Sequence, residues 1–269
     1  MRLMKRSLGC IRVAAGLSIG AAACSNTSTP APISFALSSR NPAVAPSAAW
    51  SSANGSVAAA AVAPGSDSTI TVVGTDTIIL RSVQLVVRQV ELKRADVTGC
   101  SQISGSGDCA DFETGPVLLS LPLGNGTVKE VTVTATPGVY NAFEFEVHKP
   151  SSGDTSDAAF IAANPAFANI SIRGRGTYSQ AGTRSNFTFT STVDAKQERA
   201  INPAITLPSA GSVNVTLRVD VWTWFLNAAK TALVDPASAN PGGPNESVVA
   251  NNIQASFEAF RDDAVAGVP

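Results

Sequence analysis

Three side chains that can bind metal ions or transfer protons occupy every second position of one segment. They are Glu144, Glu146 and His148. In an extended strand, alternate side chains project from the same face about 6.5–7 Å apart, so these three share one face. Two carboxylates and an imidazole can hold a metal ion, and a carboxylate pair can hydrolyse glycosides. A solvated strand face shows the same pattern without any ligand, and this is the default interpretation.

His148 is the only histidine of the chain, which restricts the catalytic devices available to it. A Ser-His-Asp or Cys-His device would have to use His148, and the chain contains no Gly-x-Ser-x-Gly motif. A zinc site built from several histidines is excluded for the same reason. We therefore expect a protein that is not an enzyme.

Trp222 and Trp224 stand beside Phe225 at the end of an expected strand. Aromatic rings exposed on a β-sandwich can stack on sugars, so the two tryptophans are candidate glycan-binding residues, as are Glu144 and Glu146 with His148. The alternative is that the aromatic cluster closes one end of the hydrophobic core.

The C-terminal segment carries a weak calcium-binding signature. Asp262 and Asp263 precede Gly267, and calcium takes oxygen ligands at alternate positions before a turn glycine. Ala264 and Ala266 remove two of these oxygens. Asp262 and Asp263 are therefore weak metal candidates, and no other cofactor is expected.

The first 24 residues have the layout of a secretory signal. Four basic residues in the first twelve are followed by residues 13–23, which are apolar or small and carry no charge. A bilayer span takes about 20 apolar residues, so this stretch is too short to cross a membrane. A basic segment before a short apolar one is typical of an export signal.

The apolar stretch ends in Ala21-Ala22-Ala23 before Cys24, which resembles the lipobox of bacterial lipoproteins. There the cysteine thiol receives a diacylglyceryl group and the cysteine becomes the new N-terminus. Ala21 replaces the usual leucine, so plain signal cleavage that leaves Cys24 as a free thiol is the alternative. In a Gram-negative host, Ser25 in second position, in place of Asp, favours the outer membrane. We expect an exported protein, lipid-anchored in the cell envelope.

Cys100 and Cys109 are the cysteines that remain after Cys10 leaves with the signal and Cys24 is acylated. No histidine or third cysteine lies near them to complete a zinc site. In an oxidising compartment they predict a disulfide across a hairpin loop. Closing a loop of about ten residues stabilises a fold by about 2.5–3 kcal/mol.

The charge balance indicates which partners to expect. Without the four basic residues of the signal, 15 of the 19 Lys and Arg remain against 20 Asp and Glu. A mildly acidic chain without a basic patch does not favour nucleic acid, because neutralising phosphates takes clustered lysine and arginine. The expected partners are the membrane, through the N-terminal lipid, and an envelope protein or a glycan.

Residues 25–67 are rich in Ser, Ala, Pro and Thr, and Arg40 is the only charge up to residue 66. Such a segment buries too little apolar surface to offset its backbone entropy, which predicts a disordered tether. Residues 33–37 alternate in hydrophobicity, and a strand there is the alternative.

Residues 68–269 are expected to form the folded domain, because alternation with a period of two runs through them. Segments around 77–94, 131–134, 143–147, 187–193 and 213–221 read as strands, and a change of phase near Arg88 and Gln89 indicates a β-bulge. With about eight strands and no regular βα alternation, the fold class is mainly β, an antiparallel two-sheet sandwich.

Two segments read as helices. Residues 157–164 before Pro165 predict a short helix. Residues 245–261 follow Pro244, have Glu246 in the first turn and place Val249 and Ile253 at helical spacing. They predict an amphipathic C-terminal helix, with a strand over 253–260 as the alternative.

The strand sequences resemble a group of bacterial envelope lipoproteins. The stretches that carry the resemblance are 78–93, 115–119, 143–150 and 219–225. The group is classified by an uncharacterised β-sandwich, domain of unknown function 4382. The resemblance implies an envelope location and a sandwich fold, and it implies no activity and no functional residue. The leading hypothesis is a non-catalytic binding or structural module, and the second is a carbohydrate- or calcium-binding module.

Overall fold

The computed structural model describes residues 31–39, 51–52, 55–58, 68–95, 110–112, 115–124, 127–135, 137–208 and 213–261. Cys24, Cys100 and Cys109 lie outside these ranges, as do Asp262 and Asp263. The lipid anchor, the disulfide and the calcium loop therefore stay predictions. Among the described helices, none has the length and apolar character that a membrane span requires.

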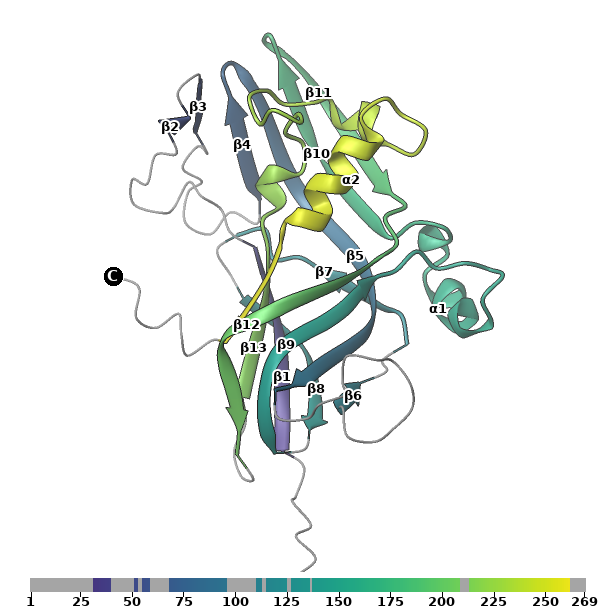
Figure 1. Cartoon of the computed structure of the whole chain (residues 1–269). Coiled ribbons are helices and arrows are strands. Elements are labelled where there is room, and N and C mark those ends of the chain that lie inside the picture. Colours follow the sequence, from purple (N-terminus) through teal and green to yellow (C-terminus); the bar gives the residue numbers. More distant parts are fainter. Residues whose placement is uncertain are drawn as a thin grey trace, which may run out of the picture.

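The described strands form two sheets, which confirms the mainly β sandwich. The smaller sheet has the order β14 (Phe257–Arg261), β13 (Val213–Val219), β1 (Ala31–Ser39), β8 (Thr127–Ala135). Its pairings are antiparallel except for β1 and β13, which run parallel. Figure 1 shows these strands beside the larger sheet.

The larger sheet is organised around one long strand, β5 (Asp76–Arg94). From one edge the order is β11 (Thr183–Ser191), β10 (Ile172–Gln180), β5, β4 (Thr69–Val73), β3 (Gly55–Ala58), β2 (Ser51–Ser52). The other strands are β6 (Ala110–Phe112), β7 (Val117–Ser120), β9 (Gly138–Val147) and β12 (Ala195–Leu207). β10 pairs with the first half of β5 and β9 with the second half, and β12 pairs with β9. The strands outnumber the eight expected, because several short ones carry no clear alternation.

The core lies between the two sheets and is closed by aromatic contacts. Phe143 and Phe145 of β9 face inward, as their alternation predicts. The ring centroids of Phe35 in β1 and Phe143 lie 5.0 Å apart, and those of Phe145 and Phe257 in β14 lie 5.2 Å apart. Both distances are typical of packed aromatic pairs. β9 therefore contacts the smaller sheet through its inward face, which leaves its other face for polar groups.

The disordered tether expected over residues 25–67 is wrong for Ala31–Ser39, which form strand β1. Ile33, Phe35 and Leu37 are buried in the core, and β1 lies in the middle of the smaller sheet between β13 and β8. The strand alternative for residues 33–37 is therefore the right one, and the folded part begins well before residue 68. A short alternating segment orders here because both of its edges pair and its apolar face is covered.

The predicted bulge lies in β5. Arg88 pairs with Glu146, and the next pair is Glu91 with Glu144, so β5 holds one more residue than β9 between them. Gln89 has a φ of 52°, in the left-handed region. Bulges bend a strand and redirect its side chains. This one falls directly after Arg88, which is part of the polar site described below.

The predicted short helix is confirmed as α1 (Ala158–Ala163), between η2 (Thr155–Asp157) and η3 (Pro165–Phe167). Phe160 and Phe167 pack on Val86 of β5 in a small apolar cluster apart from the main core. This contact fixes the segment beside the outer face of the larger sheet. Figure 1 shows α1 standing at the side of the sandwich.

The C-terminal segment combines both alternatives of the prediction. It forms α2 (Glu246–Ala255) and then β14, which pairs with β13. Val249 and Ile253 are buried from the helix and Phe257 from the strand. The helix was therefore predicted too long, because residues 257–261 are taken up as an edge strand. Two further turns, η4 (Val221–Thr223) and η5 (Pro236–Ala239), precede α2.

Candidate functional site

The polar face of β9 is buried, so its interpretation as a solvated strand face is wrong. Glu144, Glu146 and His148 are exposed by only 7%, 8% and 3%. The cause is the cover provided by neighbouring segments: β5 and β12 pair with β9 on either side, and the η2 segment lies against its end. Buried carboxylates need partners, and each of the three residues has its own set.

Glu144 belongs to a local ion-pair group. Its carboxylate lies 2.7 Å from Lys93 Nζ and 3.3 Å from Lys196 Nζ. Lys93 also pairs with Glu198, at 2.6 Å. Burial by itself raises the pKa of Glu144, but the hydrogen bonds and charges of the two lysines outweigh it and lower that pKa. Glu144 is therefore a paired structural carboxylate, apart from the other two.

Glu146 is oriented by Arg88. The guanidinium donates from Nε to Oε2 at 2.8 Å and from Nη2 to Oε1 at 3.3 Å, and Nη1 reaches Asp154 at 3.4 Å. The hydrogen bond to Glu146 raises the pKa of Arg88 above its ordinary value, against the opposing effect of burial. This two-point contact fixes the plane of the Glu146 carboxylate.

His148 is held by Asp157, which is fully buried at the end of η2. His148 Nε2 lies 2.9 Å from both carboxylate oxygens of Asp157, and the backbone N–H of Ser151 donates to one of them at 2.8 Å. An ionised carboxylate only accepts hydrogen bonds, so Nε2 carries the proton. The ring orientation and the tautomer are thereby set.

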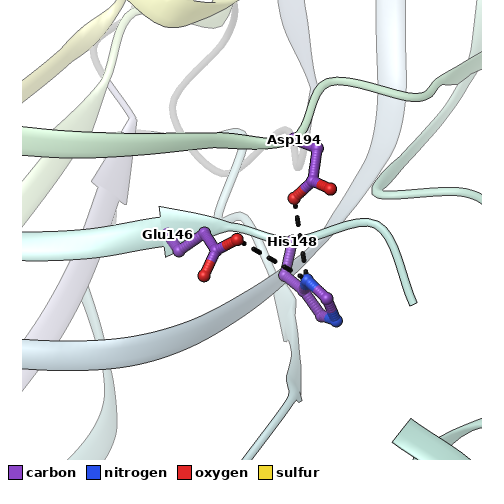
Figure 2. A group of neighbouring side chains, drawn as sticks. All are labelled: Glu146, His148 and Asp194. Atoms are coloured by element: carbon purple, nitrogen blue, oxygen red, sulfur yellow. Dashed lines mark ion pairs between the residues drawn. The ribbon is translucent and has the colours of Figure 1, made fainter. Parts of the chain in front are cut away.

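The other ring nitrogen of His148 points toward two more carboxylates. Nδ1 is buried and makes no hydrogen bond. It lies 3.8 Å from Glu146 Oε1 and 3.7 Å from Asp194 Oδ1. Figure 2 shows both carboxylates turned toward the ring, Glu146 from the same strand and Asp194 from the chain just before β12. The three ligand atoms lie within 4.8 Å of one another, the only such group of metal-binding side chains among the described residues.

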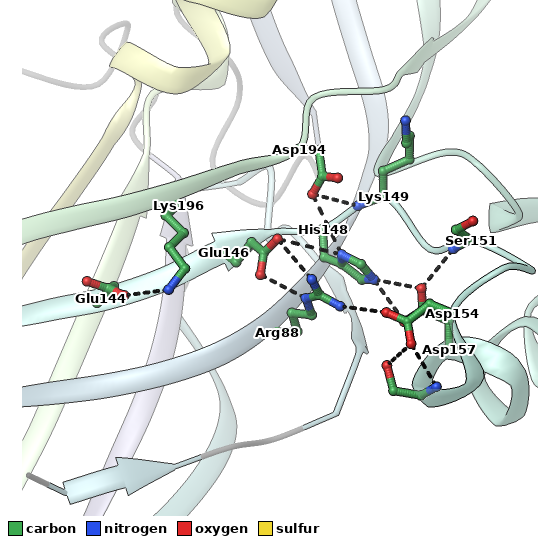
Figure 3. A network of polar contacts seen from close by, with 11 residues as sticks. Arg88, Glu144, Glu146, His148, Lys149, Ser151, Asp154, Asp157, Asp194 and Lys196 are labelled. Atoms are coloured by element: carbon green, nitrogen blue, oxygen red, sulfur yellow. Dashed lines mark hydrogen bonds and ion pairs between the residues drawn. The ribbon is translucent and has the colours of Figure 1, made fainter. Parts of the chain in front are cut away.

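The sequence predicts part of this site. Glu146 and His148 lie on one strand and meet as expected, whereas Arg88, Asp157 and Asp194 were not anticipated. Asp157 lies at the start of the expected helix and Arg88 lies beside the expected bulge. The sequence therefore predicted the local structure at both residues but gave no indication that they belong to a site. Asp194 follows an expected strand and carries no signal. Figure 3 shows how the five join in one network.

The candidate glycan site is not assembled. Trp224 is fully buried, and its Nε1–H donates to Ser256 Oγ at 2.9 Å. Trp222 lies partly buried against the core. The alternative interpretation, a cluster that closes the core, therefore describes Trp224. A buried ring offers no stacking surface, so Trp224 cannot join Glu144, Glu146 and His148 in one exposed face.

No protein-family model and no curated protein sequence matches this chain, and its resemblance to the domain of unknown function 4382 group stays a prediction. Among solved structures, the chain is similar to MbnP from Methylosinus trichosporium, with 13% sequence identity and a TM-score of 0.39. The similarity covers 87% of this chain and 98% of that one. A likeness this distant does not indicate what this chain binds.

Proposed function

We propose that this protein is an exported lipoprotein, anchored in the cell envelope through Cys24, and that its sandwich is a non-catalytic binding module. The proposed binding site is the cluster of Glu146, His148 and Asp194. The cluster lies at the end of β9, and Asp194 is the member that solvent reaches, with a side chain that is 41% exposed.

The state of His148 is the observation that carries the binding role. One ring nitrogen is fixed by Asp157, and the other makes no hydrogen bond although it is buried. Most buried polar atoms in folded proteins have a partner, and each exception needs a cause. A binding site held ready for a ligand is such a cause. The Asp194 side chain is 41% exposed, which gives that ligand a way in.

The surroundings of His148 favour binding over catalysis. A histidine that activates a nucleophile lies within hydrogen-bond reach of a hydroxyl or thiol. The groups that surround the ring here are carboxylates, and the hydrogen bonds found for its side chain go to Asp157. Because the chain has no second histidine, no other Ser-His or Cys-His pair is available.

The proposed anchor would lie close to the sandwich. The residues from Ser25 to Pro30 separate Cys24 from the start of β1 at Ala31. A chain spans at most about 3.3–3.6 Å per residue, so the first strand would begin within about 25 Å of the lipidated cysteine. The module would then work near the membrane surface, whereas a tether over residues 25–67 would hold it much farther away.

Mass spectrometry of the protein from a bacterial envelope fraction tests the anchor. The expected N-terminus is Cys24 carrying a diacylglyceryl group, and Cys24→Ser should release the protein into the soluble exported fraction. Cys10→Ser, inside the signal, is the matched control and should leave the anchor unchanged. An intact Met1, or a Cys24→Ser protein that stays in the membrane fraction, would refute the proposal.

A further inference from the structure

We infer that Glu146, His148 and Asp194 bind one divalent first-row transition-metal ion, of which zinc is the reference, through Glu146 Oε1, His148 Nδ1 and Asp194 Oδ1. The inference rests on the binding role proposed for this cluster and names the class of ligand.

Nδ1 of His148 is left without a partner beside two carboxylates. Because Nε2 is taken up by Asp157, Nδ1 is the ring nitrogen that is left to bind an ion. It faces the carboxylates of Glu146 and Asp194, which are themselves acceptors. Glu146 Oε1 accepts at 3.3 Å from Arg88 Nη2 and Asp194 Oδ1 at 3.4 Å from the Lys149 N–H, but no hydrogen bond serves Nδ1. A cation between these three atoms would serve all of them.

A second ring proton, on Nδ1, would not explain the distances from Nδ1 to the two carboxylates. If Nδ1 also carried a proton, it would be expected to donate at about 2.7–3.2 Å, as N–H donors do. The observed separations of 3.8 and 3.7 Å exceed that range on both sides. Two ligands bound to a shared zinc at about 2.1 Å in tetrahedral geometry lie about 3.4 Å apart. The separations thus approach those of metal ligands.

The local charge also calls for a cation. Glu146, Asp157 and Asp194 bring three carboxylates around the ring, and Arg88 supplies the guanidinium that pairs with Glu146. Three carboxylates face one guanidinium here, and a divalent ion would offset the remaining negative charge. The Glu146 oxygens have enough lone pairs to keep Arg88 while Oε1 binds the ion.

The second layer of contacts resembles that of established metal sites. Histidines that bind metals usually donate their other N–H to a carboxylate, which fixes the ring and strengthens the ligand. Asp157 has this position, and Figure 3 shows it on the side of the ring away from Glu146 and Asp194. The apolar contact of Phe160 and Phe167 with Val86 holds the segment that carries Asp157 in place. The ring is therefore oriented before any ion arrives.

The ligand types select the class of ion. An imidazole nitrogen with two carboxylate oxygens suits zinc and its neighbours, whereas calcium takes six to eight oxygens. Three protein ligands leave a further position, as in zinc sites that exchange water or a small ligand. Asp194, whose side chain is 41% exposed, is the proposed ligand that solvent reaches.

Calorimetric titration of the purified full-length chain with zinc sulfate tests the inference, with calcium chloride titrated in parallel. We expect one zinc per chain, bound at least tenfold more tightly than calcium. X-ray absorption at the zinc edge should show nitrogen and oxygen ligands, including one imidazole, and no sulfur. This second readout separates the site from zinc held by cysteine thiols.

Asp194→Asn is the decisive variant and Asp154→Asn is its matched control. The two side chains are exposed by 41% and 43%, and both belong to the same polar network, but only Asp194 is a proposed ligand. Asp194→Asn should weaken zinc binding at least tenfold, and Asp154→Asn by less than threefold. Circular dichroism melting curves confirm that both variants fold.

Several results would overturn the inference. They are the absence of zinc binding by the unaltered chain, sulfur in the zinc shell, equal affinities of the two variants, or tighter binding of calcium. None of these results bears on the acylation of Cys24, so the experiments test the anchor and the metal site independently.

Discussion

His148 Nε2 lies 2.9 Å from both oxygens of Asp157, a carboxylate with no exposed surface. The two residues belong to different elements, because His148 directly follows β9 and Asp157 ends η2. The contact connects the end of β9 to the η2–α1 segment. It makes a single aspartate responsible for the position of the only histidine in the chain.

The first prediction concerns this contact. Asp157→Asn keeps the size of the side chain but removes the negative charge of the carboxylate that contacts His148 Nε2 and accepts a hydrogen bond from the Ser151 N–H. Hydrogen bonds to charged groups contribute about 1.5–3 kcal/mol, so the free energy of unfolding should fall by about that amount. Urea denaturation measures it. Asp154→Asn, at an exposed position, should change stability much less, and similar losses in both variants would contradict the assigned role.

The same variant should affect zinc binding. Loss of a partner behind the metal ligands typically weakens metal binding by about 10–100-fold. If the metal site exists, Asp157→Asn should therefore bind zinc more weakly, although Asp157 does not touch the ion. Unchanged zinc affinity in a folded Asp157→Asn protein would show that Asp157 only supports the fold.

The second prediction concerns pH and Glu144. Lys93 and Lys196 lower its pKa despite burial, so the folded state holds the ionised form more firmly than the unfolded state does. The resulting stability is present above the unfolded pKa and is lost as the pH falls through the folded pKa. Glu144→Gln should therefore cost about 1.5–3 kcal/mol at neutral pH and progressively less below pH of about 4.5.

Glu258→Gln is the control for this measurement. Glu258 pairs with Arg218 at a position where its side chain is 51% exposed. Exposed ion pairs contribute about 0.2–1 kcal/mol, so this variant should differ little from the parent at any pH. Denaturation series between pH 3 and 7 compare the two. A cost of Glu144→Gln that does not change with pH would refute the electrostatic account.

The sequence predicts the parts of the fold in which one face is apolar and the other polar. Phe143, Phe145 and Val147 alternate strictly, and they form β9 as expected. The bulge after Arg88 also shows in the sequence, because it changes the phase of the alternation. β12 was missed because its apolar positions are sparse. The end of α2 was missed because Phe257 continues the helical spacing while it also fits an edge strand.

The candidate site could be predicted only within one strand. Glu146 and His148 are two residues apart, so the period of a strand brings them together. Asp157 and Asp194 reach His148 through the tertiary fold, and no spacing in the sequence encodes that. Burial of the polar face was equally hidden, because it depends on the η2–α1 segment packing on Val86.

The third prediction distinguishes the two tryptophans. Trp224→Ala should lower the free energy of unfolding by about 3–5 kcal/mol, as expected for a large buried side chain that leaves a cavity. Trp222→Ala should cost clearly less, because Trp222 is only partly buried. Thermal and chemical denaturation measure both. An exposed sugar platform at Trp224 would give a small cost for Trp224→Ala together with lost glycan binding.

The fourth prediction concerns the N-terminal boundary of the sandwich. A chain that begins at residue 68 should fail to fold, because it lacks the strand between β13 and β8. A chain that begins at residue 25 should melt cooperatively. Within the full chain, Phe35→Ala should cost about 3–5 kcal/mol through its lost contact with Phe143. A cooperative transition of the shortest chain would refute this boundary.

The parallel pairing of β1 with β13 joins two segments that lie far apart in the sequence. Ile33 pairs with Val213, so a strand made early in synthesis has to wait for one made near the end. Pairings between such distant segments form slowly, since a long loop must close first. Until β13 emerges from the ribosome, the smaller sheet lacks one of its two central strands. The smaller sheet can therefore be completed only after most of the chain has been synthesised.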